Sequence, residues 1–371
     1  TGGEGTDLLD GGNGSDTYFI DDERDTINDT GTSGTDIVYF RYLSQKYELG
    51  EGIEKVVLPG SAGASNLTVM GNISDNDITS GDGDDTVMAG DGDDTIYTGA
   101  GDDIVEAGNG NDLIIGGEGA GNDIYNGGSG MDTLKYTSAT AGITIDLFQG
   151  KATSTAGKDK AKIGNDTITS VENLIAGYHS DHLTGTNGSN SIQALSGNDW
   201  LYGALGDDNL NGGSGRDTAQ FSSNSNSINL NTTSWQNTGD GKDRLISIEN
   251  VHAGSGNDVV IGNGAANTLN GQAGNDRLYG GTGNDLLIGG GGKDRVWGQA
   301  GRDTFLIQSG TGHTIIKDFS DGEDRIQLGS GSSGLKLKTR GDDVLIYQRR
   351  DLMAIVEDAA GDLQRRGRHL G

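Results

Sequence analysis

The sequence predicts an all-β protein in which blocks of a parallel β-roll, a kind of β-solenoid, alternate with β-rich spacers and end in a C-terminal β cap. Three observations support this fold class. A nine-residue period recurs along the chain, with glycine at its second and fourth places and an apolar residue at its eighth. Glycine contributes 68 of the 371 residues, while apolar residues make up only 32%, too few for a conventional large core. The chain has no cysteine, which excludes a disulfide scaffold.

The period is clearest from residue 80 to residue 115, where four units follow one another without a gap. The first of them reads SGDGDDTVM. Glycine at alternating places lets the backbone adopt positive φ angles and form a tight bend lined by carbonyl groups. The three residues after the bend can form a very short strand, with its middle side chain directed inward. Each unit is therefore expected to form half a coil.

A short carboxylate stands at the sixth place of every regular unit. Carboxylate and carbonyl oxygens, about six to eight per ion, are the ligands that Ca²⁺ prefers. Multiple calcium ions are therefore the expected cofactor, with ligands from Asp7, Asp16, Asp85, Asp94, Asp103, Asp112, Asp123, Asp132, Asp181, Asp199, Asp208, Asp217, Asp258, Asp276, Asp285, Asp294 and Asp303. Asparagine replaces the aspartate in three units, so weaker metal sites are expected at Asn76, Asn190 and Asn267.

This pattern resembles the calcium-binding repeats of the repeats-in-toxin (RTX) family, also called hemolysin-type repeats. Their unit is G-G-x-G-x-D-x-U-x, where U is a large apolar residue. A disordered acidic linker would lack the apolar eighth place. The resemblance implies the C-terminal part of a protein exported by the type I secretion machinery, which stays unfolded at low cytosolic calcium. It also implies folding outside, on calcium, in a secreted, extracellular or cell-surface protein.

Breaks in the period divide the chain into repeat blocks and spacers. The expected blocks are 1–20, 71–136, 177–221 and 253–307, the spacers are 21–70, 137–176 and 222–252, and a capping domain (308–361) and a basic tail (362–371) follow. The second and third spacers end on a similar phrase, which contains Glu172 or Glu249, and the first spacer contains a third version of it with Glu54. These glutamates are either metal ligands or acceptors that cap the next coil. The second role is favoured because a lone glutamate has few partners with which to complete a calcium shell.

The net charge is −29, from 55 acidic and 26 basic residues. Such a chain repels itself when no cation is bound, so metal binding should be coupled to folding. The acidic balance argues against nucleic acid as a partner, because no basic patch of any extent is present. No apolar run approaches the length of a membrane span.

Catalytic signatures are missing from the sequence, so the chain is expected not to be an enzyme. It contains neither H-E-x-x-H nor a serine between two glycines in the G-x-S-x-G pattern. Two hypotheses remain. The chain is either the folding and secretion module of a larger protein, or a structural subunit of a calcium-assembled surface layer, filament or adhesin.

One outward-facing pattern bears on this choice. Residues eighteen apart should lie on the same sheet in successive coils, which aligns Ile261, Tyr279 and Trp297 at the ninth place. An exposed apolar stripe of this kind marks a contact surface. Either a spacer or the cap of the same chain covers it, or it serves self-assembly or binding of a surface polysaccharide.

Overall fold

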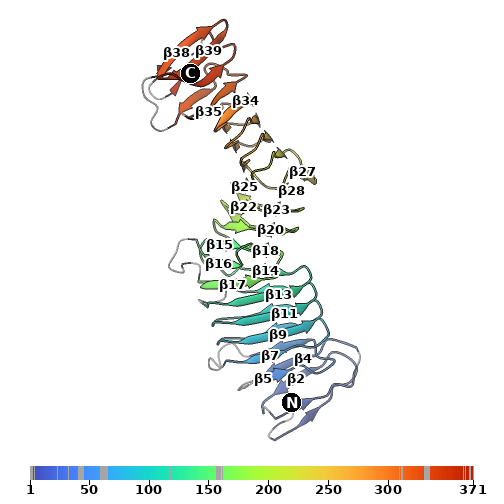
Figure 1. Cartoon of the computed structure of the whole chain (residues 1–371). Helices are drawn as coiled ribbons and strands as arrows, with labels where there is room; N and C mark the ends of the chain where they lie inside the picture. Colours follow the sequence, from blue (N-terminus) through green and yellow to red (C-terminus); the bar gives the residue numbers. More distant parts are fainter. Residues whose placement is uncertain are drawn as a thin grey trace. The chain divides into compact units, whose positions relative to one another are not determined.

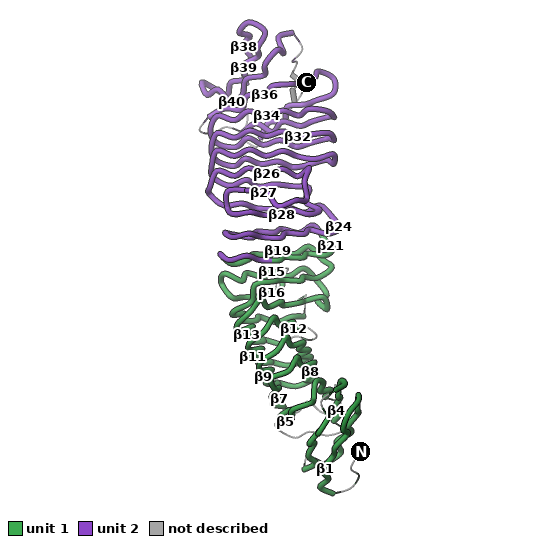
Figure 2. Tube along the Cα trace, turned by 90° about the vertical axis from the view of Figure 1, so that its right-hand side faces the viewer, with its two compact units in different colours: residues 1–186, 191–197 green, residues 187–190, 198–371 purple. Residues whose placement is uncertain are grey.

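The computed structural model describes residues 3, 5–22, 24–31, 33–40, 46–58, 66–116, 119, 121–155, 160, 162–308, 310, 312–329, 335–361, 363, 365–366 and 369–370. The described residues form strands and turns but no helix, so they offer no helical membrane span. The predicted all-β parallel solenoid is confirmed. The chain divides into two compact units, which Figure 2 distinguishes by colour: unit 1 is 1–186 with 191–197, and unit 2 is 187–190 with 198–371. Of the predicted basic tail 362–371, residues 363, 365–366 and 369–370 are described, and the others lie outside the described residues.

Unit 1 consists of short parallel strands stacked one coil above the next, as the ladder of β7, β9, β11 and β13 shows in Figure 1. One sheet contains β2 (Thr17–Ile20), β4 (Ile37–Phe40), β6 (Lys55–Val57), β8 (Asp77–Thr79), β10 (Thr95–Tyr97), β12 (Leu113–Ile115), β14 (Thr133–Lys135), β18 (Asn173–Ile175) and β20 (Ser191–Gln193). The other strands are β5 (Lys46–Glu48), β7 (Thr68–Met70), β9 (Thr86–Asp91), β11 (Ile104–Asn109), β13 (Ile124–Ser129), β15 (Ile143–Asp146), β16 (Lys151–Ser154), β17 (Asn165–Thr169), β19 (His182–Thr184), β21 (Ser196–Gly197) and the pair β1 (Leu8–Leu9) and β3 (Thr26–Ile27).

The register of these sheets makes two nine-residue units equal to one coil. Ile96 on β10 pairs with Ile78 on β8 and with Ile114 on β12, each eighteen residues away. These side chains are fully buried, while their neighbours along each strand are partly exposed or exposed. A strand of three residues buries only its middle side chain, so the core is one side chain wide per half-coil.

Strands from the segment 21–70 continue the same sheet as the repeats around them. β4 pairs in parallel with β2, and β6 pairs in parallel with both β4 and β8. In the segment 137–176, β17 pairs in parallel with β13, and the antiparallel hairpin β15–β16 follows on the other side of β17: β16 pairs with β17, and β15 pairs with β19. The non-repetitive segments therefore add coils with irregular bends to the solenoid of unit 1.

Unit 2 repeats this architecture. One sheet contains β22 (Trp200–Tyr202), β25 (Thr218–Gln220), β29 (Asn250–His252), β31 (Thr268–Asn270), β33 (Leu286–Ile288), β35 (Thr304–Ile307) and β37 (Arg325–Leu328), with β41 (Arg365–Arg366) and β42 (His369–Leu370) at its end. The other contains β26 (Ser227–Asn229), β30 (Val259–Ile261), β32 (Arg277–Thr282), β34 (Gly292–Ala300), β36 (Gly312–Ile316), β40 (Asp351–Val356), β39 (Asp343–Gln348) and β38 (Leu335–Arg340). The remaining strands are β23 (Asn209–Asn211), β24 (Ser214–Gly215), β27 (Gln236–Asn237) and β28 (Lys242–Ile246).

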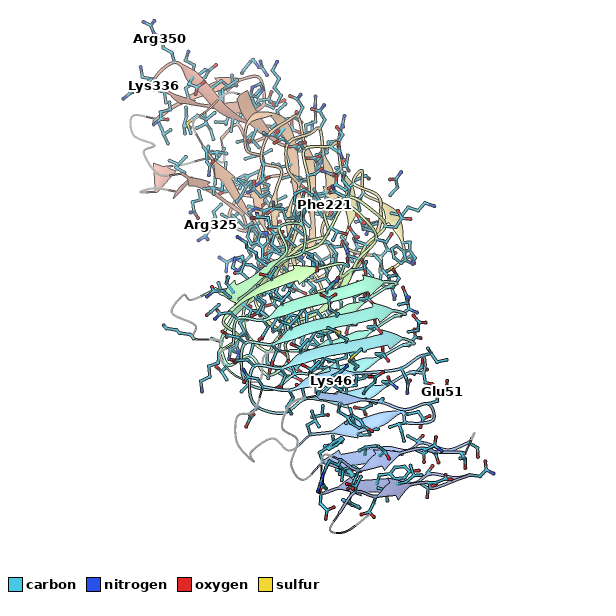
Figure 3. The ribbon with its side chains drawn as sticks, turned by 60° about the horizontal axis from the view of Figure 1, so that its bottom comes forward. Lys46, Glu51, Phe221, Arg325, Lys336 and Arg350 are labelled. Atoms are coloured by element: carbon cyan, nitrogen blue, oxygen red, sulfur yellow. The ribbon has the colours of Figure 1, made fainter. Side chains whose placement is uncertain are left out.

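The parallel pattern ends at β40, β39 and β38. β40 pairs in parallel with β36, but β39 and β38 then pair antiparallel with their neighbours. Exposed basic side chains cover this end, and Figure 3 shows Lys336 and Arg350 projecting from it. A solenoid needs such an end because its last coil would otherwise expose core and an unpaired strand edge.

Candidate metal centres

Buried aspartates follow the bends of the solenoid in rows. All but Asp294, which lies within β34, end a glycine-containing bend and directly precede a strand, so the side chain is held against the bend. Asp85, Asp94, Asp103 and Asp112 are each 1% exposed, and the other aspartates from Asp123 onward in the predicted set are no more than 4% exposed. Asp7 and Asp16 are half-buried. Burial of so many carboxylates requires a compensating interaction.

One carboxylate oxygen of most of these aspartates accepts a backbone N–H from the coil before it. The Asp85 N–H donates to Oδ1 of Asp103 at 2.9 Å, and the Asp94 N–H donates to Oδ1 of Asp112 at 2.8 Å. In unit 2 the Asp258 N–H donates to Oδ1 of Asp276 at 2.9 Å in the same way. These bonds orient the carboxylates and leave the second oxygen of each pointing toward its own bend.

That second oxygen is buried and has no hydrogen-bond donor at most positions. The atom concerned is Oδ2 of Asp7, Asp16, Asp85, Asp94, Asp103, Asp112, Asp132, Asp217, Asp258, Asp276, Asp285, Asp294 and Asp303. The glycine at the first place of the unit lies beside it: a Cβ added to Gly271 would come within 2.3 Å of Oδ2 of Asp276. An ionised oxygen in such a position needs either a proton or a cation.

The electrostatics of the buried aspartates also favour a bound cation or proton. Burial raises the pKa of Asp94 to about 7 and the pKa of Asp103 to about 8, and in unit 2 burial raises the pKa of Asp276 to about 7. Neighbouring carboxylates add to each shift. The ion pairs found among the described residues involve none of these aspartates. Within the described residues, no ion pair therefore supplies a positive charge to balance them.

The donor set suits a hard cation bound mainly through the backbone. Within the described part of the chain, no group of three or more acidic or histidine side chains lies close enough to hold a metal by itself. A calcium ion would thus take one or two of these carboxylates and complete its shell with carbonyl oxygens of the bends. Gly92 and Gly110 have φ angles of 115° and 144°, which open the bends in this way.

Two predicted ligands have a different environment. Oδ2 of Asp123 accepts the hydroxyl of Tyr125 at 2.7 Å. Asp181 accepts backbone N–H groups at both oxygens, from Ile143 at 2.9 Å and from Gly177 at 3.1 Å. Protein donors thus occupy positions that a cation would occupy elsewhere in the rows.

Two of the three asparagines also differ from the aspartates. The Asn267 amide donates to the carbonyl of Glu249 at 2.8 Å and to Oδ1 of Asn263 at 3.1 Å, while its own Oδ1 accepts the Asn263 N–H. Asn76 makes the corresponding bonds to Asn72 and to the carbonyl of Ile53. The amide donors thus face carbonyl groups. The backbone N–H of the third asparagine, Asn190, donates to Oδ1 of Asp208.

The rows also contain carboxylates that the nine-residue period did not reveal. The backbone N–H groups of known row members donate to Asp25, Asp36, Glu54, Asp166, Glu172, Asp243, Glu249 and Asp324. The three glutamates therefore act as acceptors for the coil before them, whereas the capping alternative expected them to cap the next coil. A separation of 18 or 20 residues would have found Asp25 and Asp36. Asp166 lies 43 residues after its partner, Asp123, so no fixed spacing would have found it.

The aligned outward residues lie on neighbouring strands of unit 2. Ile261 pairs with Tyr279, and Tyr279 pairs with Trp297. The rings of Tyr279 and Trp297 stack with their centroids 4.5 Å apart and an interplanar angle of 11°. All three side chains are half-buried.

Comparison with known proteins bears on the origin of these repeats. The family model of the RTX calcium-binding nonapeptide repeat (four copies) matches residues 1–27, 70–105, 79–114, 97–134, 184–219, 246–278 and 271–305, together just over half of the chain. No curated protein sequence matches the chain. Among solved structures, the extracellular lipase LipA from Serratia marcescens is similar, at 14% identity and a TM-score of 0.23. That match covers 89% of this chain and 43% of the lipase, so the chain spans less than half of that protein's length. By its repeats, this chain belongs to the RTX calcium-binding nonapeptide repeat family.

Proposed function

We propose that the chain is the non-catalytic calcium-binding region of a secreted protein, which leaves the cell through a type I secretion system and folds on extracellular calcium. The observation that carries this proposal is the set of buried carboxylate oxygens with no donor, repeated along both units. In a calcium-poor compartment these charges oppose folding. Outside the cell, each bound ion offsets them.

The thin core makes this dependence strong. One apolar side chain per half-coil buries little surface. The free energy gained from apolar burial is therefore small relative to the conformational entropy that 371 residues lose on folding. A ligand that binds only the folded state stabilises it in proportion to the logarithm of its concentration over its dissociation constant. Many such sites acting together would convert a rise in calcium into cooperative folding.

A calcium titration followed by circular dichroism tests this proposal. The full chain, dialysed against chelator, should show little strand signal and gain it cooperatively as calcium is added. Magnesium at the same concentrations should not substitute, because it demands a smaller octahedral shell and gives up its water reluctantly. A complete strand signal in excess chelator would contradict the proposal.

A second candidate function is that of a subunit in a calcium-assembled surface layer, filament or adhesin. The observation in its favour is an uneven distribution of charge. Unit 1 contains 33 acidic and 9 basic residues, for a net charge of −24, whereas unit 2 contains 22 and 17, for a net charge of −5. Sedimentation with and without calcium distinguishes the candidates: large particles favour assembly, and a compact monomer favours a secretion and folding module.

A further inference from the structure

A basic face lies on the outer side of the sheet that contains β32 and β34. It consists of Arg277, Lys293 and Arg295, whose side chains are exposed, together with the half-buried rings of Tyr279 and Trp297. Parallel pairing places Arg277 beside Arg295. The ion pairs found among the described residues do not include these three basic side chains. In a protein of net charge −29, three uncompensated cations on one face mark a site for an anionic partner.

The aromatic rings on this face favour a protein partner over a sugar. Tyr279 and Trp297 stack on each other with nearly parallel planes, so each ring covers one face of the other. A sugar ring stacks on an open aromatic face, which this arrangement restricts. The stacked pair instead forms a firm apolar ridge beside the column of guanidinium groups.

Unit 1 carries surfaces of complementary charge. Its acidic columns are two pairs of exposed aspartates, Asp75 with Asp93 and Asp84 with Asp102. The Asp93 N–H donates to Oδ1 of Asp75 at 2.8 Å, and the Asp102 N–H donates to Oδ1 of Asp84 at 2.9 Å. The two members of each column therefore lie one coil apart.

The spacing of the two surfaces matches. Arg277 and Arg295 are neighbours on adjacent parallel strands, so they too are separated by one coil, about 4.8 Å. Guanidinium groups and carboxylates thus repeat with one period, which allows several pairs to form at once. An array of pairs contributes more than an isolated surface ion pair.

We propose that the basic face of unit 2 docks onto the acidic column of Asp84 and Asp102 in unit 1 of a second copy of this chain. This inference rests on the assembly candidate above and specifies its contact. The two surfaces are different, so the contact is heterologous and joins copies into an open chain unless a rotation closes a ring. Both surfaces exist only on folded coils, which makes assembly dependent on calcium.

A charge-swap experiment tests this contact. In calcium and low salt, the full wild-type chain should sediment as large particles, and 0.5 M NaCl should dissolve them because salt screens exposed pairs. R277E/R295E and D84K/D102K should each remain monomeric. An equimolar mixture of the two variants should assemble again, because each kind of altered surface then meets its complement. Lysine should be tolerated at the aspartate positions, since Lys293 occupies the corresponding place of a unit, directly before Asp294.

The control is R349E/R350E, which changes the net charge by the same amount in an exposed turn of the cap and should assemble like the wild type. Circular dichroism in calcium checks that every variant folds, and R277Q/R295Q replaces the Glu variant if that one does not. A folded wild type that stays monomeric at low salt overturns the contact but leaves calcium-dependent folding intact. Assembly of folded R277E/R295E alone also overturns it. So does binding of the acidic polysaccharide alginate that R277E/R295E abolishes while assembly persists.

Discussion

Two steps of the solenoid in unit 2, each joining a residue to the one a coil further on, link successive coils with different chemistry. In the first step, Oδ1 of Asp294 accepts the backbone N–H of Asp276 at 3.1 Å, and Oδ2 of Asp294 has no hydrogen-bond donor. Between Glu249 and Asn267, the asparagine amide instead donates to the carbonyl of Glu249. The aspartate step needs a cation or a proton, while the asparagine step is complete without either. The solenoid therefore combines metal-dependent and metal-independent coils.

The bends that precede Asp276 and Asn267 also differ in how their backbone is shaped. We call the half-coil 271–279, which contains Asp276, the aspartate coil, and the half-coil 262–270, which contains Asn267, the asparagine coil. In the aspartate coil, Gly274 has a φ of 142° and Gln272 has a φ of 67°. In the asparagine coil, neither Asn263 nor Ala265 is left-handed; the Asn263 side chain accepts the Ala265 N–H at 2.9 Å. Such an Asx turn shapes the bend without a residue of positive φ. Asn72 and Ser74 do the same in unit 1, at 2.9 Å.

Acidification of the calcium-free protein should separate the two kinds of coil most strongly, because many carboxylates titrate together. Burial raises the pKa of Asp103 to about 8, Asp94 and Asp276 to about 7, and Asp258 to about 6. The folded state then binds more protons than the unfolded state, so its stability is greatest below about pH 4 and is lost as the pH rises toward 8. Strand signal without calcium should increase as the pH falls from 8 to 5.

Hydrogen exchange locates this effect. Protection at residues 277–279 and 295–297, which follow aspartates, should depend on pH, while protection at 268–270, which follow Asn267, should change least. Equal gains in both sets, after correction for intrinsic exchange, would remove the distinction between the coils.

A substitution at the fourth place should have the next largest effect. Gly292 has a φ of 125°, and a Cβ there would lie 1.6 Å from the carbonyl oxygen of Gly274. Gly292→Ala should lower the free energy of unfolding in saturating calcium by roughly 3 kcal/mol. Its matched control is Ala265→Gly, at the same place of the asparagine coil, where the change should stay below about 1 kcal/mol. Similar losses for both variants, measured by denaturant unfolding, would contradict the difference between the bends.

Asn267→Asp should convert one kind of step into the other. The new carboxylate would face the carbonyl of Glu249, so the variant should lose about 2 kcal/mol of stability in chelator. Calcium should recover part of that loss, and equilibrium dialysis should show tighter binding than in the wild type. Asp276→Asn provides the reverse control, since it removes a carboxylate and should weaken binding. A loss for Asn267→Asp that is the same with and without calcium would mean that the bend cannot hold an ion.

The sequence predicted the regular coils well because each unit fixes its own geometry. Glycine positions set the bends, and eighth-place residues such as Ile96 and Leu278 are buried as the period requires. The coils of the segment 21–70 were not predicted because their bends vary in length, which hides Asp36 from a nine-residue search. The amide bonds of Asn267 depend on a carbonyl from the preceding coil, and no pattern within its own unit identifies that partner.

The smallest expected effect reverses its sign between the two coils. Gln272 stands at the second place of an aspartate coil with a φ of 67°, which disfavours a residue with a Cβ. Gln272→Gly should therefore raise the free energy of unfolding in calcium by up to about 1 kcal/mol, with the greater entropy of the unfolded chain limiting the gain. Asn263 stands at the same place of the asparagine coil, but its φ is not left-handed and its side chain accepts bonds from Ala265 and Asn267. Asn263→Gly should lower the free energy of unfolding by about 1 to 2 kcal/mol, because the turn and the amide bond are both lost. If glycine stabilised both positions, the side chain of Asn263 would have no part in the bend, and the asparagine coil would differ from the aspartate coil only in charge.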